Sequence, residues 1–458
     1  MLEVLLIIIF TGLILSCSRR MGIANPFQLY FLVWFLVIFG YYASRETYIS
    51  VSSEFIVLLI AANFFSFFLL FFVYNMRKGV SKLLIPINIS KSQDRLIVLA
   101  QIAVIVALPF IYLRAITLTG GGDIFSISGY TQLRAAASDG GQSFSLYNYF
   151  MNFSFVVSSL TTFSYRQKKT NLGRLLVSVL VSLSYIYLST GRSYILFFLC
   201  LMVIPLVISE GIGLKSILTS VLIFSGLFIF SAMMTGKGIS INVGILENIQ
   251  SFTEYMRSYT VAPLLAFSKL VESGPEIDWG KNTFRFFIAL QYALGLRDTQ
   301  PESLIRDYAV VHVPTNVYTV YEVYFRDFFY FGMIIPPAFL IVHYWLYRRA
   351  LRFSGVWIFY YSASVYPLLM QFFQDQYFSL LSMWIQVAFW YWLFLGLRKS
   401  KSSNSHGPLE YRRSIGRRVY HAGINRGAFV DGCEDELHQT LPPRTLIGAE
   451  RSAPRSGS

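Results

Sequence analysis

Long apolar runs constrain this chain more than any other feature of its sequence. About eleven segments are apolar over roughly 17–25 residues, the length at which a helix crosses a bilayer while bonding its own backbone groups. Only 14% of the residues are charged, whereas a soluble domain carries about 25%. The sequence therefore predicts an all-α polytopic integral membrane protein. The expected spans are 2–18, 26–43, 54–75, 95–115, 146–165, 174–190, 194–209, 214–234, 328–347, 354–372 and 378–397.

The spans divide the chain into four regions. Residues 1–234 contain the first eight spans, and 235–327 form one large hydrophilic loop. Residues 328–397 contain the last three spans. Residues 398–458 are basic and rich in Pro, Gly and Ser, so we expect a disordered tail with no role in the chemistry.

The large loop contains two helical patterns. An apolar stripe recurs at spacings of four and three, and we expect it to pack onto the membrane domain. The segment 284–296 is apolar but too short to span, which favours an interfacial or re-entrant helix. The residues of the stripe are Ile245, Ile249, Phe252, Met256 and Tyr259.

Basic residues in the short connections predict the orientation. Connections such as 166–173 and 348–353 are rich in Lys and Arg, whereas the alternate short connections carry few. The positive-inside rule then places the N-terminus outside and the C-terminus in the cytoplasm, with 116–145 and 235–327 on the outer face. No basic stretch precedes the run 2–18, so we interpret it as a retained span rather than a cleaved signal.

Two function classes lack their characteristic residues. The net charge of +14 lies largely in short loops and the tail, which is not the pattern of a nucleic-acid-binding surface. The chain has 3 cysteines, and their spacing with histidine matches no metal site. The sequence predicts neither a nucleic-acid partner nor a bound metal.

Arg192 is the first candidate functional residue, because it interrupts apolar sequence in "YLSTGRSYILFF". The predicted orientation places it at the outer end of a tight hairpin between two spans. It could snorkel to the surface and cap the turn. It could equally present a guanidinium fork to phosphate oxygens. Other outer cations that could attract an anionic headgroup are Arg134, Arg285, Arg297 and Arg306.

A second candidate region is "VHVPTNVYTVYEVYFRDFFYFG" (311–332), which leads into the span 328–347. Its amide, tyrosine and carboxylate groups suit sugar hydroxyls, although an aromatic belt with an Arg–Asp pair would have a similar composition. The turn "QFFQDQYF" (371–378) offers comparable groups near the outer face. The polar residues singled out are His312, Asn316, Tyr318, Glu322, Arg326, Asp327 and Asp375.

These motifs together resemble the bacterial oligosaccharide repeat-unit polymerases, the Wzy O-antigen polymerase family. The resemblance covers roughly residues 1–397. Phe329 stands where the family usually has glycine, although Gly332 follows shortly. Some members of the family have an arginine, ten further residues and then a glycine. The spacing from Arg285 to Gly295 is one residue short of that motif, so no role is transferred from it. The family has a Thr-Asn-Val-Tyr-Thr pattern followed by an Asp-Phe-Gly-like step. The residues that match them are Thr315, Asn316, Val317, Tyr318, Thr319, Asp327 and Phe328.

The resemblance implies a reaction in lipopolysaccharide biosynthesis at the periplasmic face of the inner membrane. A glycan on undecaprenyl pyrophosphate passes to the terminal sugar of a second lipid-linked repeat unit, and lipid pyrophosphate leaves. The donor is already activated, so no cofactor or metal is needed. The implied partners are the lipid-linked oligosaccharide, the bilayer, a chain-length regulator and a flippase.

The protein must then stabilise charge on the pyrophosphate and help remove a proton from the acceptor hydroxyl. The residues proposed to act in catalysis are Arg192, His312, Glu322 and Asp327. A carboxylate beside an arginine is a weaker base but a good orienting group, whereas an imidazole titrates near the operating pH. The identity of the base stays open. The proposed substrate-binding residues are Arg134, Arg285, Arg297, Arg306, Asn316, Tyr318, Arg326 and Asp375.

Two rival classes stay open. A lipid-linked glycan flippase should bury polar residues in several spans and show symmetric repeats, with short loops on both faces. An O-antigen ligase or another polyprenyl-phosphosugar transferase differs from a polymerase only in its acceptor. A GT-C type enzyme would carry acidic residues in its first outer loop, but 44–53 contains only Glu46.

Overall fold

The structure of the chain is a computed structural model. It describes residues 1–18, 22, 24–75, 87–138, 145–210, 214–234, 243–353 and 355–396. The chain divides after Arg398 into two units, and the second, Lys399–Ser458, lies outside the described residues. The predicted disordered tail therefore stays a prediction.

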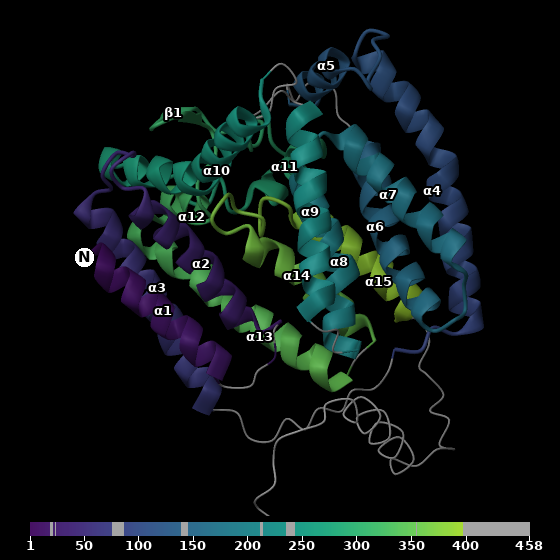
Figure 1. Cartoon of the computed structure of the whole chain (residues 1–458), viewed down its shortest axis with the longest axis horizontal. Coiled ribbons are helices and arrows are strands. Elements are labelled where there is room, and N and C mark those ends of the chain that lie inside the picture. Colours follow the sequence, from purple (N-terminus) through teal and green to yellow (C-terminus); the bar gives the residue numbers. More distant parts are fainter. Residues whose placement is uncertain are drawn as a thin grey trace, which may run out of the picture. The chain divides into compact units, whose positions relative to one another are not determined.

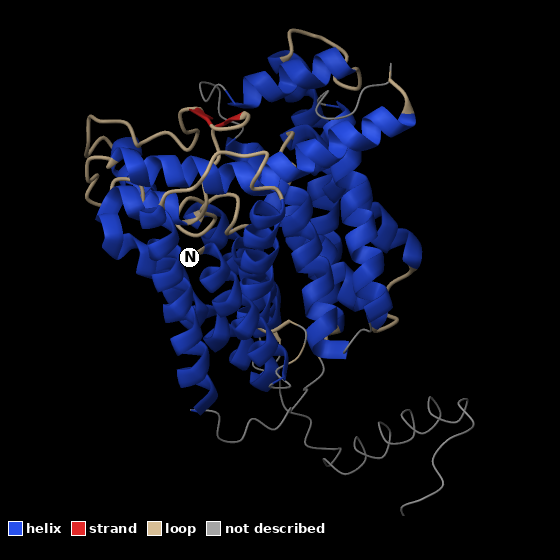
Figure 2. Ribbon diagram, turned by 60° about the vertical axis from the view of Figure 1, so that its left-hand side comes forward, coloured by secondary structure: helices blue, strands red, loops and turns tan. Residues whose placement is uncertain are grey.

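The described part is almost entirely helical, as Figure 2 shows. A helix lies in every segment predicted to span, and several boundaries coincide with the prediction. These helices are α1 (Leu2–Ser18), α2 (Pro26–Ala43), α3 (Ser53–Asn75), α4 (Lys91–Leu118), α6 (Ser145–Arg166), α7 (Leu172–Ser189), α8 (Ser193–Glu210), α9 (Leu214–Met234), α13 (Ile335–Phe353), α14 (Val356–Leu369) and α15 (Leu381–Leu395).

The remaining elements, among them the 29-residue helix α10, gather at one end of these helices. In Figure 1, α5, α10, α11 and β1 lie in the upper part of the view, above α13. The strands pair antiparallel, with Ala309 opposite Thr315. The elements are α5 (Ile127–Ser138), α10 (Ile245–Ser273), α11 (Arg285–Ala293), α12 (Tyr321–Phe328), the 3₁₀ helix η1 (Phe329–Ile334), β1 (Ala309–Val310) and β2 (Pro314–Thr315).

Length and apolar composition support association with a membrane. Among the described residues, 5 helical stretches are long and apolar enough to cross a bilayer: α2, Ser53–Val73 of α3, α4, α7 and the interrupted stretch Tyr321–Phe353. The shorter apolar helices are α1, α14, α15, Ser193–Ser209 of α8 and Leu218–Met234 of α9. The protein is thus a mostly helical membrane protein, and the predicted number of spans stays a prediction.

Helix α6 lies inside the bundle, where it contacts α4, α7, α8 and α15. Its buried face carries hydroxyl groups, and these bond to neighbouring helices. The Ser158 hydroxyl lies 2.8 Å from those of both Ser178 and Ser182 on α7, and Gln101 of α4 donates to Thr161 at 2.9 Å. Small hydroxyl side chains let helix backbones approach closely, which explains why a helix of modest hydropathy packs at the centre.

The predicted span 328–347 begins later than expected. The backbone turns at Phe329, whose φ of 53° lies outside the helical region, and helix α13 starts only after η1. A Cβ atom on Gly332 would lie 2.0 Å from the carbonyl oxygen of Tyr324, so only glycine permits η1 to fold back on α12. Prolines in the first turn of α13 need no backbone N–H and are compatible with that start.

The predicted packing of the α10 stripe is wrong for two of its residues. Ile249 is 57% exposed and Met256 is 36% exposed. The buried part of α10 lies further along, where Leu264, Leu265 and Phe267 are at most 1% exposed. The helix is longer than the stripe, and Phe267 in its second half packs against Phe55 of α3 and Tyr321 of α12.

Candidate functional site

The first cluster of charged side chains surrounds Glu322 on α12. Its carboxylate is 3% exposed and accepts from two guanidinium groups. Arg306 reaches it from the loop before β1, with Nε 2.9 Å from Oε1. Arg326, one turn further along α12, bonds the same oxygen. A buried carboxylate with two arginines fixes both guanidinium groups in place, and the group as a whole keeps a positive charge.

Asp327 connects this cluster to the loop before α11. It is fully buried and accepts from the Asn282 backbone N–H at 3.1 Å, the Asn282 side chain at 2.9 Å and the Thr283 N–H at 2.6 Å. Arg306 donates to the other side-chain atom of Asn282 at 2.8 Å. These contacts engage the carboxylate within the protein, which favours a structural role, and the predicted part of Asp327 in catalysis stays a prediction.

Other predicted residues lie around this cluster at different depths. Tyr318 is buried and donates to the Asp307 carbonyl at 3.3 Å, and burial raises the pKa of its hydroxyl. Arg285 is half-buried; burial, reinforced by the nearby Arg306, lowers the pKa of its guanidinium. Arg297 is exposed and bonds Thr299, so it lies outside the cluster.

Asn316 and His312 lie on either side of β2. Asn316 is half-buried in the loop that follows the strand. His312 is exposed in the turn between the strands, with its ring 5.1 Å from that of Tyr48 and edge-on to it. The imidazole is therefore accessible but is not part of the Glu322 cluster.

Arg192 forms a second cationic site in the turn between α7 and α8. Thr190 ends α7 with a left-handed φ of 55°, and α8 begins at Ser193. Arg192 is only 8% exposed, and its guanidinium donates to the Tyr255 hydroxyl at 2.6 Å. It also lies over the rings of Phe228 and Tyr255, at 5.6 and 5.8 Å. This burial argues against a snorkelling residue, because a snorkelling head group lies in water.

A cavity of about 130 Å³ adjoins this arginine. Tyr130 of α5, Thr190 and Ser231 of α9 contribute its polar lining. Burial raises the pKa of the Tyr130 hydroxyl, and the charges of Arg192 and of Arg134, also on α5, oppose that shift. The cavity therefore has one guanidinium, that of Arg192, and a few hydroxyl groups on a lining that is otherwise apolar.

Helix α10 connects the two cationic sites. Its first half supplies Tyr255 to Arg192, and Tyr259 one turn later stacks on Phe373 at 5.2 Å. Its second half contacts α12 through Phe267 and Tyr321, and Lys269 donates to the Val310 carbonyl of β1 at 2.8 Å. The segment 370–380, which contains Phe373, also meets α12, because the Val320 N–H donates to the Gln371 carbonyl at 2.8 Å. Both sites therefore belong to one connected end of the bundle.

The sequence predicted 371–378 as a turn at the outer rim, and in the structure Gln371, Asp375 and Gln376 of that turn are buried. Asp375 is 1% exposed and accepts from the Tyr324 hydroxyl at 2.9 Å, the Tyr377 N–H at 3.1 Å and Ser379. Burial raises the pKa of the carboxyl, and these hydrogen bonds oppose that shift. Asp375 is therefore held by the protein itself.

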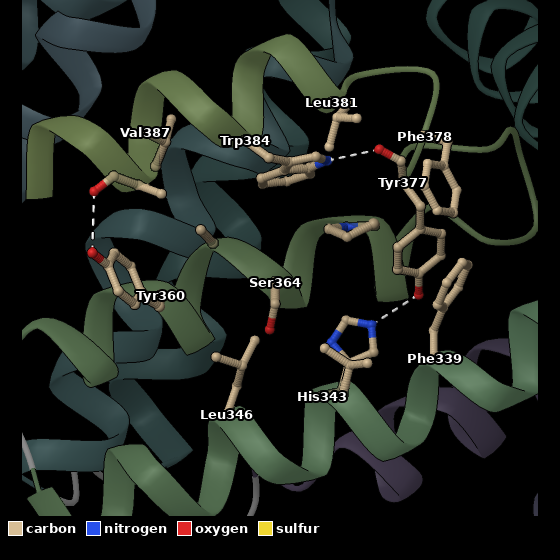
Figure 3. Close-up of a pocket in the computed structure, with 14 residues that line it drawn as sticks. Phe339, His343, Leu346, Tyr360, Ser364, Tyr377, Phe378, Leu381, Trp384 and Val387 are labelled. Carbon is tan, nitrogen blue, oxygen red and sulfur yellow. Dashed lines mark hydrogen bonds between the residues drawn. The ribbon is translucent and has the colours of Figure 1, made fainter. Parts of the chain in front are cut away.

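A larger cavity of about 350 Å³ lies between α13, α14 and α15. Figure 3 shows Phe339, Tyr360 and Trp384 lining it, with Ser364 among few polar groups. His343 of α13 projects into it. The cavity is almost entirely apolar, so it suits a hydrocarbon chain better than a sugar.

His343 lies at the end of a chain of hydrogen bonds. The Trp34 N–H donates to Gln371 Oε1 at 3.0 Å, so the Gln371 amide nitrogen donates to the Tyr377 hydroxyl at 3.1 Å. The Tyr377 hydroxyl in turn lies 2.9 Å from His343 Nε2 (Figure 3). His343 Nδ1 has no hydrogen-bond partner within the described part of the chain.

The sequence identified the charged residues of the Glu322 cluster and of the Arg192 site, but it did not predict this apolar cavity. His343 stands alone in an apolar run and gives no local signal, and Trp34 lies 337 positions from Gln371. Among the described residues, no group of 3 or more His, Cys, Asp and Glu side chains could hold a metal ion. No protein-family model, curated protein or solved structure matches this chain.

Proposed function

We propose that the chain is a polymerase of lipid-linked glycans. It would join undecaprenyl-pyrophosphate-linked oligosaccharide repeat units at the periplasmic face of the bacterial inner membrane, as a multi-pass protein. The observation that carries the proposal is Arg192, a buried guanidinium held by Tyr255 beside a cavity at the end of a helical hairpin. A permanent charge is costly at such a position unless it has a function.

The donor would bind with its pyrophosphate at Arg192 and Arg134. A guanidinium fork matches phosphate oxygens, and the partial burial strengthens the contact. The charge on the leaving pyrophosphate grows during glycosyl transfer, so contacts that strengthen with it lower the barrier. The reaction breaks the bond between the anomeric carbon and the pyrophosphate oxygen and forms one to the acceptor hydroxyl, whose proton passes to a base.

The acceptor glycan would bind near the Glu322 cluster. Glu322 holds Arg306 and Arg326 in fixed positions, and Tyr318 adds a hydroxyl close by. Guanidinium, phenol and amide groups are suited to sugar hydroxyls. Because the carboxylates of Glu322 and Asp327 are engaged within the protein, His312 is the more accessible candidate for the base.

Variants at Arg192 test the proposal. Arg192→Ala should lower the rate of polymer formation about 10- to 100-fold or more, because charge-assisted contacts are worth about 1.5–3 kcal/mol each. Arg192→Lys should recover part of the rate, since an ammonium keeps the charge but loses the planar fork. Tyr255→Phe, which keeps the ring but removes the hydroxyl, should fall between Lys and wild type. Polymer length from labelled lipid-linked repeat units in membrane vesicles is the readout.

Arg45→Ala is the matched control, because Arg45 is exposed and also lies over a tyrosine ring, that of Tyr42 at 4.9 Å. Wild-type polymer from Arg192→Lys, with losses in Arg192→Ala that follow protein level, would remove Arg192 from the site. Transfer of a single repeat to a lipid A core acceptor would instead indicate a ligase. Movement of unpolymerised repeat units across the membrane would indicate a flippase.

A further inference from the structure

A cavity of about 500 Å³ lies where α3 and α13 end, away from the cationic sites described above. One side consists of Leu69, Phe72 and Val73 from α3, and Ile341 and Trp345 from α13 face them. The rim carries Arg348, Arg349 and Arg352. The cavity therefore combines an apolar interior with a cluster of positive charges at its edge.

The lining changes character along one face of α13. Ile341, Trp345, Arg348 and Arg352 follow one another at spacings of four, three and four, so they lie on one helical stripe. The stripe is apolar toward the middle of the helix and basic toward its end. This is the order in which a lipid presents its chain and its headgroup.

Aromatic rings hold the guanidinium groups in place. Arg349 lies over Trp345, Phe353 and Trp357 at 5.2, 5.1 and 5.3 Å. Arg348 lies over Tyr344 at 5.9 Å. Within the described residues, none of the rim arginines forms an ion pair with a carboxylate. Like charges are therefore gathered within about one turn without a neutralising acid from the described chain.

We propose that this cavity binds an anionic phospholipid. The phosphate would bind Arg348 and Arg352, with Arg349 completing the positive rim, and an acyl chain would lie against Leu69 and Phe72. Basic pockets beside spanning helices are suited to anionic headgroups, and each arginine near the surface contributes about a fivefold gain in affinity. A free phosphate would use the rim but not the apolar interior, which is why the geometry favours a whole lipid.

The test uses the purified full chain in neutral detergent micelles. Phosphatidylglycerol, phosphatidylcholine and inorganic phosphate are added separately, and bound lipid is measured by native mass spectrometry beside the thermal unfolding midpoint. We expect phosphatidylglycerol to be retained and to raise the midpoint, with at least tenfold weaker retention of phosphatidylcholine. Equal retention of the two lipids, or an equal midpoint shift with phosphate, would overturn the proposal.

Variants separate the headgroup from the chain. Arg348→Gln with Arg352→Gln should weaken phosphatidylglycerol retention about 25-fold, and the corresponding Lys pair should retain most of it. Ile341→Trp keeps every charge but fills the cavity, so it should also reduce retention. Arg95→Gln, at an exposed arginine near the start of α4, is the matched control and should bind as wild type. Unchanged retention in both the Gln pair and Ile341→Trp would contradict the proposal.

Discussion

Buried charged residues in this protein fall into two kinds. Asp327 and Asp375 accept several hydrogen bonds from the protein, and these bonds hold loops against α12 and within 370–380. Arg192 instead borders a cavity, and Arg306 and Arg326 share one carboxylate. Residue type alone does not separate these kinds, because each depends on what the folded chain places beside the side chain.

Asp327→Asn distinguishes a structural role from a catalytic one. An amide would turn its NH₂ group toward donors that now bond a carboxylate, so we expect a loss of about 1.5–3 kcal/mol in stability. Polymer formation should fall only as far as folded protein falls. The measurement is thermal unfolding in detergent beside polymer yield per folded protein. Asp298→Asn, at an exposed position between α11 and β1, should change neither.

The opposite pattern would assign Asp327 to the chemistry. Loss of polymer from Asp327→Asn with an unchanged unfolding midpoint would show that its carboxylate acts on the substrate. The hydrogen bonds to Asn282 and Thr283 would then be secondary to that role.

At the scale of single elements, α10 shows how one helix serves two environments. Its first half exposes Ile249 and carries Tyr255 to Arg192, and its second half buries Phe267 against α3 and α12. The helix therefore acts as a rigid connection between the bundle and the cationic turn.

The two halves of α10 should respond differently to truncation of a side chain. Leu265→Ala should cost about 2–5 kcal/mol because Leu265 is 0% exposed and its removal leaves a cavity. Ile249→Ala should change stability by at most about 0.5 kcal/mol, as exposed positions usually do. Thermal unfolding of both variants in the same detergent checks this. A large loss from Ile249→Ala would mean that the stripe packs after all, as the sequence predicted.

At the scale of the whole molecule, the predicted orientation sets the side on which each site works. Arg192, α5 and α10 should face outside, and the connection 166–173 should face the cytoplasm. The proposed lipid cavity at the end of α13 would then lie in the cytoplasmic leaflet, opposite to the proposed reaction.

Thiol labelling checks the orientation. In a variant without Cys17, Cys200 and Cys433, single cysteines at Ser138 and Gly274 should react with an impermeant maleimide added to intact cells from which the outer membrane has been removed. A cysteine at Thr170 should react only after lysis. Labelling of Ser138 and Gly274 only after lysis would contradict both the orientation and a periplasmic reaction.

The helices could be predicted closely because helix formation in a membrane is a local property. Each apolar run satisfies its own backbone hydrogen bonds, so the run itself sets where the helix lies. The predicted spans 2–18, 26–43 and 214–234 agree with α1, α2 and α9. The start of α13 was misplaced because Gly332 and Phe329 fold η1 back on α12, a contact that apolar composition does not register.

The sites depended on contacts between residues far apart in the chain. The sequence alone singled out Arg192 as a charge between two apolar runs, Glu322 as part of a polar cluster that leads into a span, and Arg306 as one of several outer cations. Only the tertiary structure decided that Arg192 is buried against Tyr255 and that Glu322 holds Arg306. The apolar cavity beside His343 also exists only because α13, α14 and α15 come together in the folded chain. The physical reason is that burial and hydrogen bonding depend on which helices become neighbours. The hydropathy of an apolar segment depends only on the residues of that segment.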